Sequence, residues 1–358
     1  MSNQRKYFGD IVDIRAGFGF DLARLEGFLA QRVAGFEGPL TARQFDGGQS
    51  NPTYILDTPG RTYVLRRKPP GVTLGSAHAI DREFRVLSAL FAQGFPVPEP
   101  LVYEEDEGII GSPFYLMAHV AGRIFFDCTL PDLTPDERGE LCNSVIDTLA
   151  RLHDFVPDEI GLAGYGKPGN YFERQVSRWT RQYQASADRP IAAMDRLIEW
   201  LPARVPAPLP GGDRIVHGDF SFHNILIHPT EPRVVGVIDW ELSTTGDPMG
   251  DLLYHTLEWY RPAGIDPRGT LRGLDLHALG FPTEDEHLAR YFRQRGLTAP
   301  ADYSFYRAYN LFRIAAIWQG IVAREKAGNA AASNARQLAS LIEPIAEAAW
   351  AEARSIGA

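Results

Sequence analysis

The sequence predicts an α+β fold with two domains, an antiparallel sheet carrying one helix and then a mainly helical domain. Three observations support this prediction. Residues 40 to 68 alternate apolar and polar side chains around a Gly-Gly and a Pro-Gly turn. Residues 78 to 93 repeat apolar side chains with the period of an amphipathic helix. Farther along the chain helical periodicity dominates, interrupted by a hairpin at 214 to 241. We therefore expect an N-terminal domain 1–120 and a C-terminal domain 121–358.

The N-terminal domain begins with a predicted helix over residues 20 to 33, because its apolar side chains recur on one face. The segments "LTARQFDGG", "NPTYILDT" and "RTYVLRRK" follow as three short strands of an antiparallel meander. The helix at 78 to 93 ends at "GFPVPEP", where Gly and Pro break the helical pattern. Two more strands are predicted in "LVYEEDEGIIGSPFYLMAHV", one on each side of an acidic turn.

The C-terminal domain contains a helix start at Thr134, where Pro135 and Glu137 complete the pattern of a capped N-terminus. Its hairpin consists of two apolar strands, Ile225–Ile227 and Val234–Ile238, joined by a turn that contains proline. The last predicted elements are two helices separated by "KAGNAAAS".

Composition and charge exclude several functional classes. Of the 358 residues, 44% are hydrophobic and 23% are charged, as in an ordinary soluble globular protein. A formal net charge of -9 provides no domain-wide positive field, so we expect no nucleic-acid partner. There is no apolar run of membrane-spanning length and no secretory signal, so we expect no membrane partner and a cytoplasmic protein. The two cysteines, Cys128 and Cys142, match no metal-binding spacing and fit a reducing compartment.

Three polar residues stand out around the hairpin: Asp219, Asn224 and Asp239. A hairpin returns the chain to its starting point, so Asn224 and Asp239 are expected at the same end of two paired strands. Carboxylate and amide oxygens held close together suit Mg²⁺, with water and substrate phosphate filling its other positions. Asp219 lies five residues before Asn224, in a loop, where a carboxylate can accept the proton of an attacking hydroxyl group.

Other interpretations remain open for these residues. Taken singly, an aspartate after glycine is typical of a turn, and an asparagine before a strand is typical of a cap. A zinc hydrolase is a further alternative, since histidine and aspartate both bind Zn²⁺. Its ligands would be His217, Asp219, His223 and Asp239. We expect His217 instead to orient the loop, and His223 and His228 to have no direct role.

The segments "HGDFSFHNILI" and "VIDWE" resemble the aminoglycoside phosphotransferase and choline kinase branch of the protein-kinase-like fold. The resemblance covers about residues 20 to 345. It implies two lobes, an N-lobe with an antiparallel sheet and one helix, and a mainly helical C-lobe with the catalytic hairpin. It also implies an ATP- and Mg²⁺-dependent kinase that transfers the γ-phosphate to a small-molecule hydroxyl group. Asp219 would then be the catalytic residue, and Asn224 and Asp239 would hold the metal.

The resemblance assigns nucleotide contacts in the N-terminal domain. In "FDGGQSNPTYIL", Gly47, Gly48 and Ser50 match a turn whose backbone N–H groups approach the phosphates. Arg66 stands where the family has a lysine, and its guanidinium can still bind phosphate. Glu83, on the following helix, is expected to pair with Arg66.

In the strand "FYLMAHV", the resemblance expects backbone groups of Met117 and His119 to pair with adenine. Downstream, "TGDPMGDL" supplies Asp247 and Asp251, which are expected to hold the catalytic region together. His153 is expected to pack behind the catalytic loop. We predict that His153, Asp247 and Asp251 are structural.

The acceptor is predicted from a narrower resemblance. The segments "VLRRKPPG", "STTGDPMGDL" and "FRIAAIWQGIVAR" are similar to the kinase-like domain that precedes acyl-CoA dehydrogenase domains in larger proteins. This implies a hydroxyacyl-CoA acceptor and leaves no segment of this chain for a dehydrogenase. Two alternatives stay open, an aminoglycoside or amino-alcohol kinase, and an inactive nucleotide-binding module. The arginine at the lysine position supports the second alternative.

Overall fold

The computed structural model describes residues 11–46, 51–69, 80–326, 335–355 and 357. The chain divides into two compact units. The first unit contains Met1–Phe126, Pro157–Tyr165 and Phe222–Ser243, and the second contains Asp127–Val156, Gly166–Ser221 and Thr244–Ala358. The first break, at Phe126, lies close to the expected boundary at residue 120. The sequence did not predict that two later segments would fold with the N-terminal residues.

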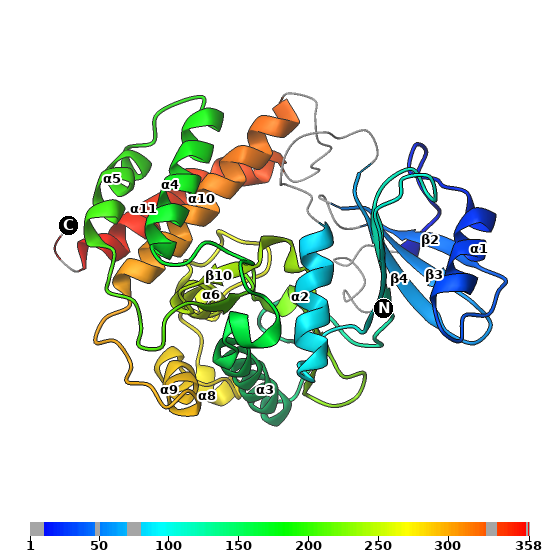
Figure 1. Cartoon of the computed structure of the whole chain (residues 1–358). Helices are drawn as coiled ribbons and strands as arrows, with labels where there is room; N and C mark the ends of the chain where they lie inside the picture. Colours follow the sequence, from blue (N-terminus) through cyan, green and yellow to red (C-terminus); the bar gives the residue numbers. More distant parts are fainter. Residues whose placement is uncertain (1–10, 47–50, 70–79, 327–334, 356, 358) are drawn as a thin grey trace. The chain divides into compact units, whose positions relative to one another are not determined.

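The first unit is built on a six-stranded antiparallel sheet with the order β1-β2-β3-β4-β6-β5 (Figure 1). Its strands are β1 (Ile11–Val12), β2 (Thr41–Phe45), β3 (Thr53–Asp57), β4 (Thr62–Arg67), β5 (Pro100–Glu104) and β6 (Phe114–Ala118). The three predicted meander strands and the two later strands are confirmed. Strand β1 was not predicted, because two residues carry no periodicity.

Helix α1 (Leu22–Arg32) covers one face of this sheet (Figure 1). Asp21 caps it by accepting a hydrogen bond from the Arg24 N–H at 3.0 Å. Leu25 and Leu29, from the predicted apolar face, are fully buried. They pack with alternate side chains of the strands: Tyr54, Leu56, Tyr63, Leu65, Phe114 and Leu116. Burial of this cluster fixes the register of the sheet, because a slip of one residue would turn these side chains to the opposite face.

Strand β4 places its two arginines on opposite faces, as the alternation of a strand requires. Arg67 shares the α1 face, where its Nε donates to the Ser112 hydroxyl at 2.9 Å and its guanidinium lies 5.7 Å from the Phe20 ring centre. Arg66 points to the other face, toward Glu83 of α2 (Ile80–Ala92). The sheet therefore separates a structural arginine from the arginine that was predicted to bind phosphate.

The predicted hairpin is confirmed as β8 (Ile225–Ile227) and β9 (Val234–Val237). Short 3-10 turns flank it, Phe222–Asn224 before β8 and Trp240–Leu242 after β9. The hairpin joins the first unit through backbone hydrogen bonds, from Val237 N–H to the Pro96 carbonyl (2.8 Å) and from Arg123 N–H to the Ile227 carbonyl (2.7 Å). These long-range pairings leave no local pattern in the sequence. They explain why the hairpin folds with the first unit and not with the helical residues around it in sequence.

The segment Pro157–Tyr165 joins the same unit through side chains of α2. Arg82 donates to the Tyr165 carbonyl and Arg85 to the Ala163 carbonyl, both at 2.7 Å. The Arg82 guanidinium also lies 4.3 Å from the centre of the Tyr165 ring. Two arginines of α2 thus have partners far away in sequence, separated by 83 residues for Arg82 and Tyr165 and by 78 residues for Arg85 and Ala163.

The second unit is mainly helical, as predicted. Its helices are α3 (Pro135–Asp154), α4 (Tyr171–Ser186), α5 (Ala192–Trp200), α6 (Met249–His255), α7 (Leu257–Tyr260), α8 (Leu276–Leu279), α9 (Glu284–Gln294), α10 (Ser304–Lys326) and α11 (Ala335–Arg354). The predicted start of α3 is confirmed by a capping box between Thr134 and Glu137. A two-stranded ladder pairs β7 (Arg214–Val216) with β10 (Thr244–Gly246). Among the described residues, none of the helices is both long enough and apolar enough to span a bilayer.

Three buried histidines of the second unit are expected to lower its stability in acid. Burial lowers the pKa of His153 and of His287, and it lowers the pKa of His255 to about 3. His255 and His287 face each other with their Nε2 atoms 3.0 Å apart. The folded state keeps these rings neutral, whereas the unfolded state takes up protons below the ordinary pKa of 6.5. Their contribution to the free energy of unfolding is therefore present above that pH and is lost as the pH falls.

We expect the free energy of unfolding to decrease by about 1.4 kcal/mol per pH unit for each such histidine below its unfolded pKa. Denaturant unfolding of wild type and His287→Gln at pH 7 and pH 5 measures this, because the contributions of other groups largely cancel in the comparison. The variant should lose less stability than wild type on acidification. An equal or greater loss in the variant would contradict the assignment of His287 as a neutral buried group.

Candidate functional site

Asp219 follows strand β7 in a loop of the second unit, and the loop backbone is held by Asp251 of α6. The Asp251 carboxylate accepts hydrogen bonds from the backbone N–H groups of His217 at 2.5 Å and Gly218 at 2.8 Å. The Asp219 N–H donates to Nδ1 of the His217 ring at 3.1 Å. Asp219 is partly exposed, whereas His217 and Asp251 are buried. The predicted role of His217 in orienting the loop is confirmed by this contact.

A buried chain of polar side chains continues behind the loop. His153 of α3 places Nε2 3.4 Å from Oδ2 of Asp251 and Nδ1 2.7 Å from the hydroxyl of Tyr291 on α9. Burial acts to raise the pKa of the Asp251 carboxyl, but its contacts with His153 and His217 outweigh burial and lower that pKa. Asp247 accepts a hydrogen bond from the Met249 N–H at 2.9 Å, at the start of α6. The structural roles predicted for His153, Asp247 and Asp251 are confirmed.

Asn224 and Asp239 lie at the same end of the hairpin, as predicted, in the first unit. The Ile238 N–H donates to the Asn224 carbonyl at 3.0 Å, which closes the hairpin between them. Asp239 adopts a left-handed conformation with φ 66° and ψ 63°, which an aspartate tolerates but rarely adopts. Its side chain is 32% exposed. A carboxylate oxygen and an amide oxygen in this arrangement fit a Mg²⁺ ion that takes its remaining ligands from water and phosphate.

The structure brings Arg66 and Glu83 together and adds two carboxylates that flank Trp240. Arg66 Nε lies 3.3 Å from Glu83 Oε2, and its Nη2 lies 2.9 Å from Asp239 Oδ1 and 3.2 Å from Glu241 Oε2. Glu83 also accepts hydrogen bonds from Asn51 and from the Tyr115 hydroxyl, both at 3.0 Å. One guanidinium thus faces three carboxylates.

Burial and charge act in opposite directions on this cluster. Burial lowers the pKa of the Arg66 guanidinium. The negative charges of Glu83 and Asp239 raise this pKa by more than burial lowers it, so it lies well above its ordinary value. Burial raises the pKa of the Glu83 carboxyl, and Arg66 offsets only part of that increase. Arg66 is therefore a permanent positive charge at the base of the cluster, which is the property that a phosphate-binding side chain needs.

The remaining predicted nucleotide contacts have different outcomes. Gly47, Gly48 and Ser50 lie outside the described residues. Met117 is buried in β6, opposite Val64 of β4 on one side and Pro100 of β5 on the other. The His119 N–H donates to the Thr62 carbonyl at 3.2 Å, so this donor is used within the sheet. Pairing of adenine with the His119 N–H would require that hydrogen bond to open.

The zinc alternative finds no support in the described part of the chain, which contains no group of three or more His, Cys, Asp or Glu side chains arranged to hold a metal ion. His223 belongs to the short turn before β8. The His228 ring accepts a hydrogen bond from the Glu231 N–H at 3.1 Å and thereby shapes the turn between β8 and β9. This contact gives His228 a role in the hairpin turn.

The sequence did not point to two residues that contact Asp219 or its loop. Tyr254 of α6 hydrogen-bonds to the Asp219 side chain. Arg313 of α10 donates through Nη2 to the Gly218 carbonyl, and its guanidinium lies 4.6 Å from the centre of the Tyr254 ring. Tyr254 could have been found, because it lies three residues after Asp251 and so shares its helix face. Nothing local in the sequence connects Arg313 with the loop.

Comparison with known proteins gives the family of this chain. The family model described as the phosphotransferase enzyme family matches residues 41–309. The chain belongs to this family. The match includes strand β4 with Arg66, the loop with Asp219 and the hairpin with Asn224 and Asp239. The predicted family and the assignment as a phosphotransferase are therefore confirmed.

Several relatives of this phosphotransferase are parts of longer proteins. It is 44% identical over 343 residues to acyl-CoA dehydrogenase family member 11 of Gallus gallus and 41% identical over the same length to that of Homo sapiens. In both cases the alignment covers 94% of this chain and 44% of the relative. The chain thus spans less than half of the curated relatives that it matches, in agreement with the predicted resemblance to their kinase-like domain.

Solved structures agree with the fold. A candidate aminoglycoside phosphotransferase from Ralstonia eutropha superimposes with a TM-score of 0.86 at 44% identity, covering 94% of this chain and 99% of that one. Spectinomycin phosphotransferase, solved with ADP and spectinomycin, superimposes with a TM-score of 0.60 at 13% identity, covering 93% and 98%. The predicted α+β, protein-kinase-like fold of this phosphotransferase is confirmed.

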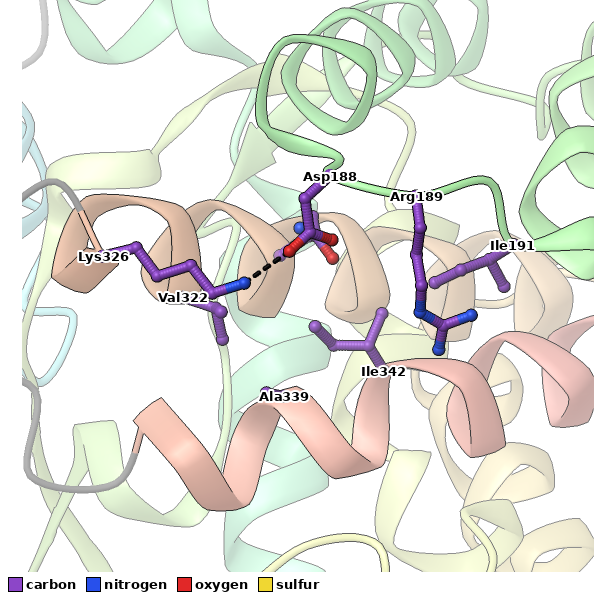
Figure 2. A pocket seen from close by; sticks show the side chains of 8 residues that line it. Asp188, Arg189, Ile191, Val322, Lys326, Ala339 and Ile342 are labelled. Atoms are coloured by element: carbon purple, nitrogen blue, oxygen red, sulfur yellow. Dashed lines mark hydrogen bonds and ion pairs between the residues drawn. The ribbon is translucent and has the colours of Figure 1, made fainter.

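A separate cavity of about 330 Å³ lies in the second unit between α10, α11 and the segment before α5 (Figure 2). Its floor is apolar, with Val322 and Ile342 facing the hollow (Figure 2). The charged side chains at its rim are paired, Asp188 with Lys326 and Arg189 with Glu343. Because these charges neutralise each other, we assign no part of phosphoryl transfer to this cavity.

Proposed function

We propose that this phosphotransferase is a kinase that uses ATP and Mg²⁺ to phosphorylate a hydroxyl group of a small molecule. The observation that carries the proposal is the contact of Arg66 with both Glu83 and Asp239. A fixed cation braced by a buried carboxylate, next to a partly exposed aspartate, is the arrangement that phosphoryl transfer from a nucleotide requires. Phosphotransferases of this fold solved with ADP support the choice of a nucleotide donor.

Each group has a defined task in the proposed reaction. Asn224 and Asp239 would hold Mg²⁺, which when bound neutralises charge on the phosphate oxygens. Arg66 positions the phosphates of the donor. Asp219 accepts the proton of the acceptor hydroxyl. The hydroxyl oxygen forms a bond to the γ-phosphorus while the bond from that phosphorus to ADP breaks. Catalysis then depends mainly on positioning and on charge neutralisation.

We propose a hydroxyacyl-CoA, or a similar hydroxy-acid thioester, as the acceptor. The environment of Asp219 supports an acceptor that is not cationic, because the Arg313 guanidinium lies 4.6 Å from the centre of the Tyr254 ring. Two acids that could have bound an amino group already have arginine partners, Glu241 with Arg66 and Glu258 with Arg261. The names of the curated relatives, which refer to acyl-CoA, also favour a thioester.

The test is a panel of acceptors incubated with ATP and Mg²⁺, followed by measurement of ADP release and by mass spectrometry of the acceptor. The panel contains a hydroxyacyl-CoA, the same acyl-CoA without its hydroxyl group, the free hydroxy acid, an amino sugar and an amino alcohol. We expect phosphorylation of the hydroxyacyl-CoA and none of the matched acyl-CoA. Phosphorylation of the amino sugar or the amino alcohol alone would replace the proposed acceptor.

The same panel separates the kinase from an inactive nucleotide-binding module. A module of that kind would show thermal stabilisation by ATP and Mg²⁺ with no ADP release for any acceptor. That combination would overturn the proposed activity while leaving nucleotide binding in place.

A further inference from the structure

Helix α6 holds the loop before Asp219 at two points, one turn of helix apart. The Asp251 carboxylate accepts hydrogen bonds from the backbone N–H groups of His217 and Gly218. Tyr254, three residues later and therefore on the same side of the helix, hydrogen-bonds to the Asp219 carboxylate. One short helix thus fixes both the loop backbone and the side chain that the proposed reaction uses as a base.

Tyr254 is well placed to act as a donor to this carboxylate. Its side chain is 8% exposed. Burial raises the pKa of the Tyr254 hydroxyl, and the nearby charge of Asp219 raises it further, against the opposing influence of Arg268 and Arg313. The hydroxyl therefore keeps its proton at neutral pH and donates it in a hydrogen bond. A hydrogen bond to an ionised acceptor is stronger than one between neutral groups.

Arg313 of α10 holds Tyr254 and the loop together. Its guanidinium lies 4.6 Å from the centre of the Tyr254 ring and 5.5 Å from that of Trp179. The same side chain is 4% exposed and donates to the Gly218 carbonyl. A planar guanidinium that lies over an aromatic ring and hydrogen-bonds a carbonyl is held in one orientation, which a lysine could not reproduce.

We propose that Tyr254, held in place by Arg313, orients the Asp219 carboxylate toward the acceptor hydroxyl. This inference rests on the proposed function, in which Asp219 accepts the proton of the acceptor. Tyr254 and Arg313 are positioning residues, since they act through Asp219. The groups that face Asp219 and Tyr254 are the His217 ring from the loop, Arg313 from α10 and Arg268 from the segment after α7.

The experiment compares Tyr254→Phe with Tyr260→Phe, a matched control. Tyr260 is also buried and donates its hydroxyl to the Leu253 carbonyl at 2.6 Å, so its replacement removes a similar hydrogen bond that does not involve the loop. For Tyr254→Phe we expect kcat to fall about 10- to 100-fold, the effect of removing a hydrogen bond to a charged group, with KM for ATP unchanged. The acid limb of the pH profile should move to higher pH, because the ionised carboxylate loses a donor.

A second measurement does not depend on activity. Carbon-13 NMR of labelled aspartate carboxyl groups, with Asp219→Asn used to identify the resonance, gives the titration midpoint of Asp219. This midpoint should move to higher pH in Tyr254→Phe and stay at the wild-type value in Tyr260→Phe. An unchanged midpoint in Tyr254→Phe, or an equal change in both variants, would overturn the inference. A shifted midpoint in a protein that phosphorylates no acceptor would uphold the positioning by Tyr254 and overturn the proposed function alone.

Discussion

Asp219→Asn is expected to abolish measurable phosphoryl transfer while nucleotide binding persists. Asparagine has nearly the same shape as aspartate but cannot accept the proton of the acceptor hydroxyl. The loss of a general base typically lowers kcat by about 10²- to 10⁴-fold. The loop should keep its conformation, because Asp251 holds it through the backbone N–H groups of His217 and Gly218. Calorimetric titration with ATP and Mg²⁺ should therefore give a dissociation constant close to that of wild type.

Asp213→Asn is the matched control for this experiment. Asp213 lies in the same stretch of chain and accepts a hydrogen bond from the Gly169 N–H at 2.6 Å, but it has no part in the proposed reaction. Its replacement should leave kcat within about 2-fold of wild type. Turnover by Asp219→Asn at a rate similar to that of the control would rule out Asp219 as the base.

Asp239→Ala is expected to remove the Mg²⁺-dependent part of nucleotide binding. The variant keeps Asn224 but loses the carboxylate that would hold the metal, so the affinity for ATP in the presence of Mg²⁺ should fall by at least about 10-fold. The first unit should still fold, because Arg66 keeps its contacts with Glu83 and Glu241. Titration with ATP in the presence of Mg²⁺ or of a chelator measures the difference directly.

Asp57→Ala provides a comparison in which an arginine of the same sheet also loses its carboxylate partner. Asp57 accepts a hydrogen bond from Arg43 at 3.0 Å on the surface. We expect this variant to bind ATP with the same Mg²⁺ dependence as wild type. If Asp239→Ala also kept that dependence, the metal would be held by other residues.

Several elements of both units follow from local patterns that the sequence displays. Alternation along β4 separates Arg66 from Arg67, and the helical period of α2 places Glu83 apart from Phe84 and Leu87. The hairpin strands are bounded by the polar residues Asn224 and Asp239, which mark their ends. In each case a regular period or a turn residue determines the element within a few residues, so no distant contact has to be known.

Two contacts that matter for the site and were not predicted join segments distant in sequence. Arg313 reaches Gly218 across 95 residues, and Arg66 reaches Glu241 across 175. Neither pairing changes the local period, since an arginine on a helix or a strand has the same pattern whether it faces solvent or a carbonyl. The same reason explains why the hairpin was expected in the helical domain, although its backbone pairs with Pro96 and Arg123.

The discontinuous first unit has a consequence for how this chain folds during synthesis. The six-stranded sheet is complete in sequence by Ala118, but the hairpin that pairs with Pro96 and brings Asp239 to Arg66 is made only when the ribosome has passed residue 243. Until then, Asp239 and Glu241, two of the carboxylates that contact Arg66, are absent from the nascent chain. A fragment ending at Phe126 should therefore fold poorly alone, and the first unit should complete its fold only after residue 243 has left the ribosome.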